Sequence, residues 1–288
     1  MNPAVTEMLS RYEITTTGEA ENALKEIIQE IALLGLHRAK FFEKAAFYGG
    51  TALRVLYRLP RYSEDLDFTL FAPNQKFSLT PYLSAVEKEL AAYGFQTTIG
   101  IVDKKIKTEI ESAFIKANTR IHLLEIEALK KYGPTNHKDS KLQIKFEVDT
   151  DPAISFQSET QYLLSPISFP IISLKKPDLF AGKLHALLYR SWKNRVKGRD
   201  FYDYVWYLKN SVPVRLEYLR DKAIQSGHAK PTDLKDLKQL KEALSRRFKT
   251  VDFENAKRDV ASFVKNQSEL EAWSLDFFLK ITEMLGVV

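Results

Sequence analysis

The stretch from Phe47 to Phe68 reads FYGGTALRVLYRLPRYSEDLDF and indicates both a local fold and a chemistry. Lys44 to Tyr48 is short and apolar, as a strand is, and Thr51 to Arg58 has the pattern of a helix whose first residue is a candidate N-cap. Gly49 and Gly50 between them allow the backbone to approach a bulky anion, at which the helix N-terminus points free N–H groups. The pair therefore predicts a phosphate site, with a simple tight turn as the alternative.

Two aspartates follow in the same stretch. Ser63 to Phe71 alternates between polar and apolar residues and predicts a strand, so Asp65 and Asp67 share one face while Leu66 and Phe68 pack on the other. Two carboxylates this close repel each other unless a charge neutralises them. Mg²⁺, or Mn²⁺, binds oxygen ligands and shares its shell with substrate phosphates. The pattern predicts a metal site, and an acidic strand edge exposed to water is the alternative.

A third acid is expected if two metal ions are to bridge the attacking and leaving oxygens. The strand predicted from Leu142 to Asp149 reads LQIKFEVD, in which Glu147 lies among apolar neighbours. We therefore prefer Glu147, with Asp149 as the second choice. An ordinary polar sheet face is the alternative interpretation.

After Pro177 strand patterns disappear and helical patterns follow one another, so we expect an α+β chain with an α/β domain over residues 1–170 and a helical domain over 171–288. On the first of these helices Lys183 and Arg190 share a flank. Lys183 is a suitable point-charge contact for a triphosphate, and Asp200 on the next helix could pair with it or position an acceptor hydroxyl. Salt bridges between helices are the alternative.

Other segments have weaker or purely architectural patterns. Glu19 to Leu36 and Thr80 to Tyr93 predict helices, and 95–102, 110–116 and 121–129 predict strands. Residues 151–170 are expected to be irregular. Further helices are predicted at 179–193, 200–208, 214–226, 233–248, 253–264 and 270–285.

Composition excludes several classes of protein. The 288 residues are 44% hydrophobic and 28% charged, which is typical of a globular chain. There is no cysteine, hence no disulfide, thiolate metal site or cysteine nucleophile. The start of the chain does not resemble a signal peptide and no apolar run is long enough to span a membrane, so we expect a soluble, cytoplasmic protein. Neither an HExxH nor a GxxxxGK[ST] motif is present.

The combination of motifs resembles one family. GGTALR, a short spacer and RYSEDLDF, followed by the KxxALxxR helix at Lys183 and the Arg-Asp-Phe-Tyr-Asp stretch from Arg199 to Asp203, resemble the AbiEii-type nucleotidyltransferases, the toxins of bacterial abortive-infection toxin–antitoxin pairs. The resemblance covers roughly residues 20–210. It implies a polymerase-beta-like nucleotidyltransferase domain whose active-site cleft is completed by a helical domain.

The resemblance also implies roles for residues. It places Gly49, Gly50 and Thr51 along the triphosphate with Ser63 assisting, Asp65 and Asp67 on the metal together with an acid of the IKFEVDTD segment, and Lys183 and Asp200 as the remaining site residues. Asp203 is an alternative to Asp200. Arg58 and Arg61 flank the acidic strand, where they either contact phosphates or only solvate the loop.

Substrate and partners are likewise implied by the resemblance. The NTP would be GTP or a pyrimidine triphosphate, the acceptor the 3′ end of a tRNA, and the protein partner a cognate antitoxin. The chain carries a net charge of +6 and its basic stretch from Lys175 to Arg199 suits an RNA acceptor. The rival interpretations are nucleotide transfer to a protein hydroxyl and a non-catalytic nucleotide or RNA binder, and a solvated helix face is the plain explanation of the basic stretch.

Overall fold

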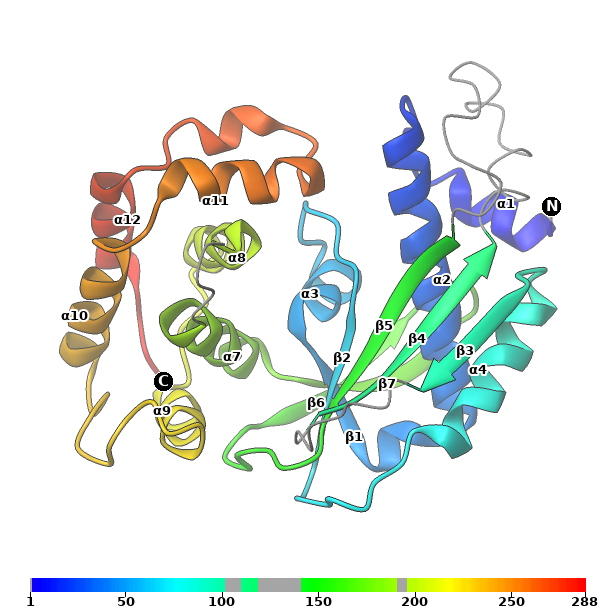
Figure 1. Ribbon diagram of the computed structural model, residues 1–288, viewed down its shortest axis with the longest axis horizontal. Coiled ribbons are helices and arrows are strands. Elements are labelled where there is room, and N and C mark those ends of the chain that lie inside the picture. The colour runs from blue at the N-terminus through cyan, green and yellow to red at the C-terminus, as the bar shows by residue number, and fades with distance from the viewer. Residues whose placement is uncertain (1, 102–109, 119–140, 191–195) are drawn as a thin grey trace. The chain divides into compact units, whose positions relative to one another are not determined.

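The chain folds into two compact units. The structure is a computed structural model that describes residues 2–101, 110–118, 141–190 and 196–288 (Figure 1). The first unit comprises Met1–Tyr57, Tyr62–Pro152 and Thr160–Ser173, and the second Arg58–Arg61, Ala153–Glu159 and Leu174–Val288. The division expected from the sequence, at residue 170, is contiguous, whereas the second unit includes two short segments from earlier in the chain.

A seven-stranded mixed sheet carries two of the predicted metal ligands, Asp67 and Glu147. Its strands, in the order β3-β4-β5-β2-β1-β7-β6 across the sheet, are β1 (Ala45–Tyr48), β2 (Leu66–Leu70), β3 (Thr97–Ile101), β4 (Ile110–Asn118), β5 (Lys141–Asp149), β6 (Ser158–Leu163) and β7 (Phe169–Leu174). β2 runs antiparallel to β1 and parallel to β5. Together with its helices, this mixed sheet confirms the α+β class.

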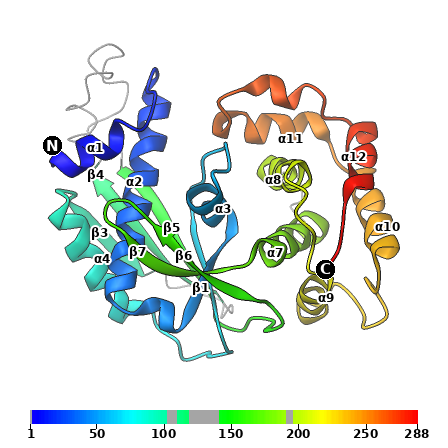
Figure 2. The same cartoon turned by 180° about the vertical axis from the view of Figure 1, so that it is seen from behind.

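The described part of the first unit contains four α-helices. They are α1 (Pro3–Leu9), α2 (Thr17–Arg38), α3 (Gly49–Tyr57) and α4 (Thr80–Ala92). α2 begins in a capping box, in which the Thr16 side chain accepts from the Glu19 backbone N–H and the Glu19 side chain accepts from that of Thr16. α2 and α4 lie side by side over one face of the sheet (Figures 1 and 2). The buried apolar side chains of α2 and of strands β1, β2 and β5 form the core of this unit.

The expectation of an irregular segment over residues 151–170 was wrong in part, since only 151–157 and 164–168 lack regular structure. β6 and the start of β7 lie there. β6 reads SETQYL and is exposed along most of its length at the edge of the sheet, so it shows no apolar alternation in the sequence. In β7, Pro170 interrupts a segment whose residues Phe169 and Ile171 are buried. The strand expected at 121–129 lies outside the described residues.

The second unit is helical and has an aromatic core. Its helices are α7 (Lys176–Tyr189), α8 (Gly198–Lys209), α9 (Leu216–Gln225), α10 (Leu237–Phe248), α11 (Phe253–Val260) and α12 (Leu275–Ile281). Phe180 of α7 stacks on Tyr207 of α8 with ring centroids 4.2 Å apart, and Phe278 of α12 packs against Phe248 at 5.3 Å. Aromatic pairs contribute beyond their buried area, so the first contact holds α7 against α8 and the second holds α12 against α10. None of the described helices is both long and apolar enough to cross a membrane.

Candidate functional site

Gly49 places the glycine turn directly against Asp67. It follows the last residue of β1, Tyr48, which is opposite Asp67 in the antiparallel register. Gly49 has a positive φ of 82°, which residues with a Cβ rarely adopt, and a Cβ built there would collide with the Asp67 carboxylate. Only glycine therefore suits this position, both by conformation and by space.

We expect Gly49→Ala to lower the free energy of unfolding by about 1–3 kcal/mol, because alanine is strained at positive φ and its methyl group displaces the Asp67 carboxylate. Urea denaturation followed by circular dichroism measures the change. Gly18→Ala is the matched control, since a Cβ at Gly18 has nothing within 4 Å. Equal stability of Gly49→Ala and wild type would contradict the packing described for this turn.

Thr51 does not act as the N-cap that its position suggested. α3 begins at Gly49, so Thr51 lies inside its first turn, where it is fully buried. Its hydroxyl donates a hydrogen bond to the backbone carbonyl of Asp65. Thr51 therefore fixes the chain as it enters β2. In this structure its hydroxyl is committed to that carbonyl, whereas the resemblance places it along a triphosphate.

A glutamine missed by the sequence analysis holds the other side of the same loop. Gln29 of α2 is buried, and its side-chain amide donates to the carbonyl oxygens of Ser63 (3.1 Å) and Glu64 (3.0 Å). In the sequence Gln29 lies two residues from both Ile27 and Ile31, on the opposite side of the predicted helix from its apolar stripe, so no sequence signal marks it as buried. Gln29 and Thr51 together fix the backbone that carries Asp65.

The two aspartates have the alternation expected of a strand. Leu66 and Phe68 are fully buried, whereas Asp65 and Asp67 are half-buried. β2 begins at Leu66, so Asp65 is the last residue before the strand and not a member of it. The burial pattern agrees with both carboxylates lying on the face away from the Leu66 and Phe68 side chains.

The sheet register brings Glu147 next to Asp67. β2 and β5 are parallel, with Asp67 opposite Glu147 and Thr69 opposite Asp149. Lys145 forms an ion pair with Glu147, and the Asp149 carboxylate accepts from the Asp151 backbone N–H at 3.2 Å. By register, Glu147 is thus the acid of β5 nearer to Asp67.

A divalent metal fits this corner of the sheet by its donor chemistry. Asp65, Asp67 and Glu147 offer only carboxylate oxygens, the ligands that Mg²⁺ prefers, and no soft ligand lies among them. Within the described ranges of the chain, no three acidic or histidine side chains lie close enough together to enclose an ion. A site of this kind keeps water and substrate phosphate as the remaining ligands, so a closed protein cage is not required.

In the helical unit, Lys183 and Asp200 do come together, within a larger buried charge network. Lys183 Nζ lies 3.5 Å from Asp200 and 2.7 Å from Asp203, and Arg190 contacts Asp200 at 2.9 Å. Lys183 of α7 and Arg190, the residue that directly follows this helix, both contact Asp200 and so lie on the same side, as predicted. The nearer partner of Lys183 is Asp203, which the sequence analysis kept as the alternative.

Arg61 completes this network from a buried position, so the expectation that it only solvates the loop was wrong. It is buried, and its Nε and Nη2 each donate to one oxygen of Asp203 at 2.6 Å. Burial alone would raise the pKa of Asp203, but the charges of Arg61 and Lys183 outweigh it and hold that pKa below its ordinary value. Arg61 thus keeps Asp203 ionised, and Asp203 in turn positions Lys183. Arg58 by contrast is exposed.

The basic stretch 175–199 is only partly a surface. Lys175 donates to Gln157, and Arg199 is buried with its guanidinium 4.1 Å from the Phe263 ring. Lys193 and Arg195 lie outside the described residues. The described cations of this stretch are thus largely engaged within the unit and do not form an open row.

Lys197 has an unusual pKa, from which a pH dependence follows. Burial lowers its pKa from 10.5 to about 8, opposed by the charge of Asp200. The unfolded chain therefore binds more protons between about pH 8 and 10.5, and stability due to this group rises with pH across that window. Below pH 8 the cost of burying the charged amine is present in full.

We expect Lys197→Gln to melt at a higher temperature than wild type near pH 7, because the cost of burying the charged amine disappears with it. The difference should shrink by about pH 9.5, where the wild-type lysine is neutral in the folded state. Calorimetric melting at both pH values measures this. Lys209→Gln, at the exposed other end of α8, is the control and should show no such change. A pH-independent difference for Lys197→Gln would contradict the assignment.

Comparison with known proteins finds a matching protein family and similar solved structures. A family model described as "Nucleotidyl transferase AbiEii toxin, Type IV TA system" matches residues 31–280. The crystal structure of JHP933 from Helicobacter pylori is similar with a TM-score of 0.49 and 18% identity, covering 91% of this chain and 89% of that one. That of a "putative nucleotidyltransferase from H. pylori" has a TM-score of 0.46 and 19% identity, with 89% of each chain covered. No curated protein matches significantly.

Proposed function

Since the chain belongs to the AbiEii family of nucleotidyl transferase toxins of type IV toxin–antitoxin systems, we propose that it transfers a nucleoside monophosphate from an NTP to the 3′ end of a tRNA, with release of pyrophosphate. The observation that carries this proposal is the corner formed by Gly49, Asp67 and Glu147. There the glycine backbone at Gly49 lies against the Asp67 carboxylate. Asp67 is in turn opposite Glu147 on the neighbouring strand.

The carboxylates of this corner are proposed to hold Mg²⁺ or Mn²⁺ through Asp65, Asp67 and Glu147. When bound, the ion would neutralise charge that develops on the transferring phosphoryl group. We also propose that Glu147, once its ion pair with Lys145 is broken, takes the proton of the attacking hydroxyl. The chain itself supplies mainly positioning, because phosphoryl transfer needs little covalent help from the protein.

The glycine turn is proposed to bind the triphosphate. Gly49 and Gly50 open helix α3, whose first N–H groups have no partner within the helix and whose dipole favours an anion. Ser63 would assist triphosphate binding from the loop that Gln29 holds. Thr51 would act indirectly, through its hydrogen bond to the Asp65 carbonyl in the same loop. In the helical unit we assign Lys183 as a phosphate-binding cation, positioned by Asp203, and Asp200 as its second carboxylate partner.

The charge of the helical segment favours a nucleic-acid acceptor. Residues 174–288 contain 23 Lys and Arg against 15 Asp and Glu, a net +8, whereas the whole chain carries +6. An excess of positive charge attracts phosphate backbones and makes binding dependent on salt. An acceptor hydroxyl on a protein would not need this charge, so RNA is preferred.

Labelling with each of the four α-labelled NTPs tests the proposal. Purified protein is incubated with one NTP, Mg²⁺ and either total tRNA or cell protein. We expect label in the tRNA fraction, sensitive to removal of the 3′-terminal nucleotides and absent with Asp65→Ala. Label in protein alone would overturn the RNA acceptor in favour of a protein hydroxyl. Label that persists with Asp65→Ala would overturn the assignment of the metal site.

Two further expectations follow from the family. A type IV system implies a cognate antitoxin as partner. We place the reaction in the cytoplasm, where NTPs and tRNA are available. GTP and the pyrimidine triphosphates are the substrates to compare first.

A further inference from the structure

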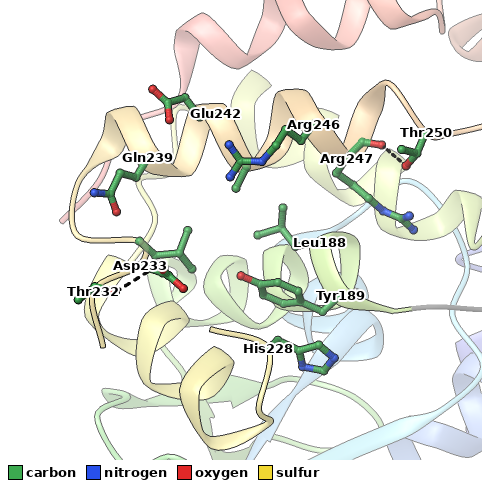
Figure 3. A pocket seen from close by; sticks show the side chains of 12 residues that line it. Leu188, Tyr189, His228, Thr232, Asp233, Gln239, Glu242, Arg246, Arg247 and Thr250 are labelled. Carbon is green, nitrogen blue, oxygen red and sulfur yellow. Dashed lines mark hydrogen bonds between the residues drawn. The ribbon is translucent and has the colours of Figure 1, made fainter. Parts of the chain in front are cut away.

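The helical unit contains a pocket that the proposed chemistry does not use. Its volume is about 580 Å³, and it is lined by the C-terminal end of α7, by α10 and by the segment from His228 to Leu234 (Figure 3). This volume lies within the range of roughly 300–1,000 Å³ found for ligand sites. Its main lining residues are Leu188, Tyr189, His228, Asp233, Arg246 and Arg247.

An aromatic pair forms one wall of the pocket. Tyr189 stacks on His228 with ring centroids 4.8 Å apart and an angle of 23° between the rings, and Figure 3 shows the two side chains next to each other. Ser226 Oγ lies 2.8 Å from His228 Nδ1 and 2.8 Å from His185 Nε2. Burial lowers the pKa of His185 to about 3, so its imidazole is neutral. The hydroxyl bridge holds the aromatic wall in a fixed orientation.

Arg246 and Arg247, two neighbouring arginines of α10, differ in their contacts. Arg247 Nε donates to the Leu187 carbonyl at 2.9 Å and its Nη2 to the Arg190 carbonyl at 3.2 Å, so it satisfies the C-terminal end of α7. Arg246 is exposed, and in the part of the chain that the structure describes it forms no ion pair or hydrogen bond. Arg246 is thus the cation that can bind an incoming anion.

The charges of Arg246 and Asp233 both affect the pKa of the Tyr189 phenol. Burial raises the pKa of the Tyr189 phenol, the Asp233 carboxylate raises it further, and the charge of Arg246 opposes the rise. In Figure 3 the phenol oxygen points toward Asp233, and α10 with Arg246 and Gln239 lies across the pocket. A flat ring stacked on Tyr189 would therefore have a cation and hydrogen-bonding groups around its edge.

We propose that this pocket binds one nucleotide of a single-stranded RNA, with its base stacked on Tyr189 and a neighbouring phosphate on Arg246. An aromatic face accepts any base, and a guanidinium binds phosphate without regard to sequence. The exposure of His228, Asp233 and Arg246 suits a strand that continues past the pocket on both sides. The proposal rests on the proposed function only in taking RNA as the acceptor.

Fluorescence anisotropy with a short labelled single-stranded oligoribonucleotide tests it. We expect Tyr189→Leu, which keeps an apolar side chain on α7, to weaken binding roughly tenfold. Arg246→Gln should weaken binding and reduce the slope of log K against log salt by about 0.7, the loss of one phosphate contact with a single strand. Arg258→Gln is the matched control, because Arg258 is an exposed arginine of α11 away from the pocket.

The outcomes separate this site from the transfer reaction. Asp65→Ala should bind the oligonucleotide as wild type does, so loss of transferase activity and loss of RNA binding are scored independently. Unchanged binding by both Tyr189→Leu and Arg246→Gln, each shown by circular dichroism to be folded, would overturn the proposal. Mononucleotides that bind as tightly as the oligonucleotide would also overturn it, since the pocket would then be a small-molecule site.

Discussion

Asp67→Asn should lower the rate of nucleotide transfer about a thousandfold or more while leaving the unfolding transition where it is. Asparagine has the shape of aspartate, so it can occupy the space beside Gly49 and keep the register with Glu147. It loses the negative charge through which the residue is proposed to hold a divalent ion. Such an ion contributes several kcal/mol of transition-state stabilisation, which corresponds to at least this factor in rate.

Single-turnover labelling at a saturating NTP concentration measures the change, with Mg²⁺ varied to separate metal affinity from chemistry. Glu64→Gln is the matched control: it removes an acid from the same loop, and the ion pair of Glu64 with Lys25 is long, at 3.7 Å, and partly exposed. We expect it to stay within about a factor of two of wild type, since exposed pairs contribute little. Wild-type turnover by Asp67→Asn would show that the carboxylate has no part in catalysis.

The sequence predicted local features well because alternation and glycine placement are local signals. Leu66 and Phe68 have the alternating burial expected of a strand, and Gly49 has the positive φ that a glycine turn suggests. The pairing of β2 with β5 was not predictable in the same way. The two strands are separated by about seventy residues, and only their register selects Glu147 as the acid opposite Asp67.

What the sequence could not show were the partners of buried polar residues. Arg61 is 142 residues from Asp203, and nothing local distinguishes it from the exposed Arg58. Gln29 lies on the side of α2 opposite Ile27 and Ile31, where a polar residue is expected to be exposed, and nothing local identifies the carbonyls that it binds. Long-range hydrogen bonds of this kind depend on the tertiary fold, so periodicity and propensity carry no information about them.

Asp203→Asn should destabilise the helical unit by about 3–5 kcal/mol, the usual cost of leaving a buried charge without its partner. Arg61 is 1% exposed and both of its hydrogen bonds to Asp203 measure 2.6 Å, so the guanidinium would remain buried beside a neutral amide. Lys183, 2.7 Å from the same carboxylate, would keep Asp200, at 3.5 Å, as its ion-pair partner among the residues that the structure describes. Urea denaturation followed by circular dichroism measures the loss.

A double variant separates the cost of an unpaired charge from a loss of packing. Arg61→Met with Asp203→Leu removes both charges and keeps the apolar volume, so it should be more stable than Asp203→Asn alone. Lys257→Gln is the control: its pair with Glu254 also measures 2.7 Å, but Glu254 is 76% exposed, and we expect a change of at most about 0.5 kcal/mol. If Asp203→Asn cost no more than Lys257→Gln, burial would not be what makes this pair strong. We therefore expect the absence of water around the Arg61–Asp203 pair, and not its length, to make its loss costly, and the same burial to keep Asp203 fixed as the partner that positions Lys183.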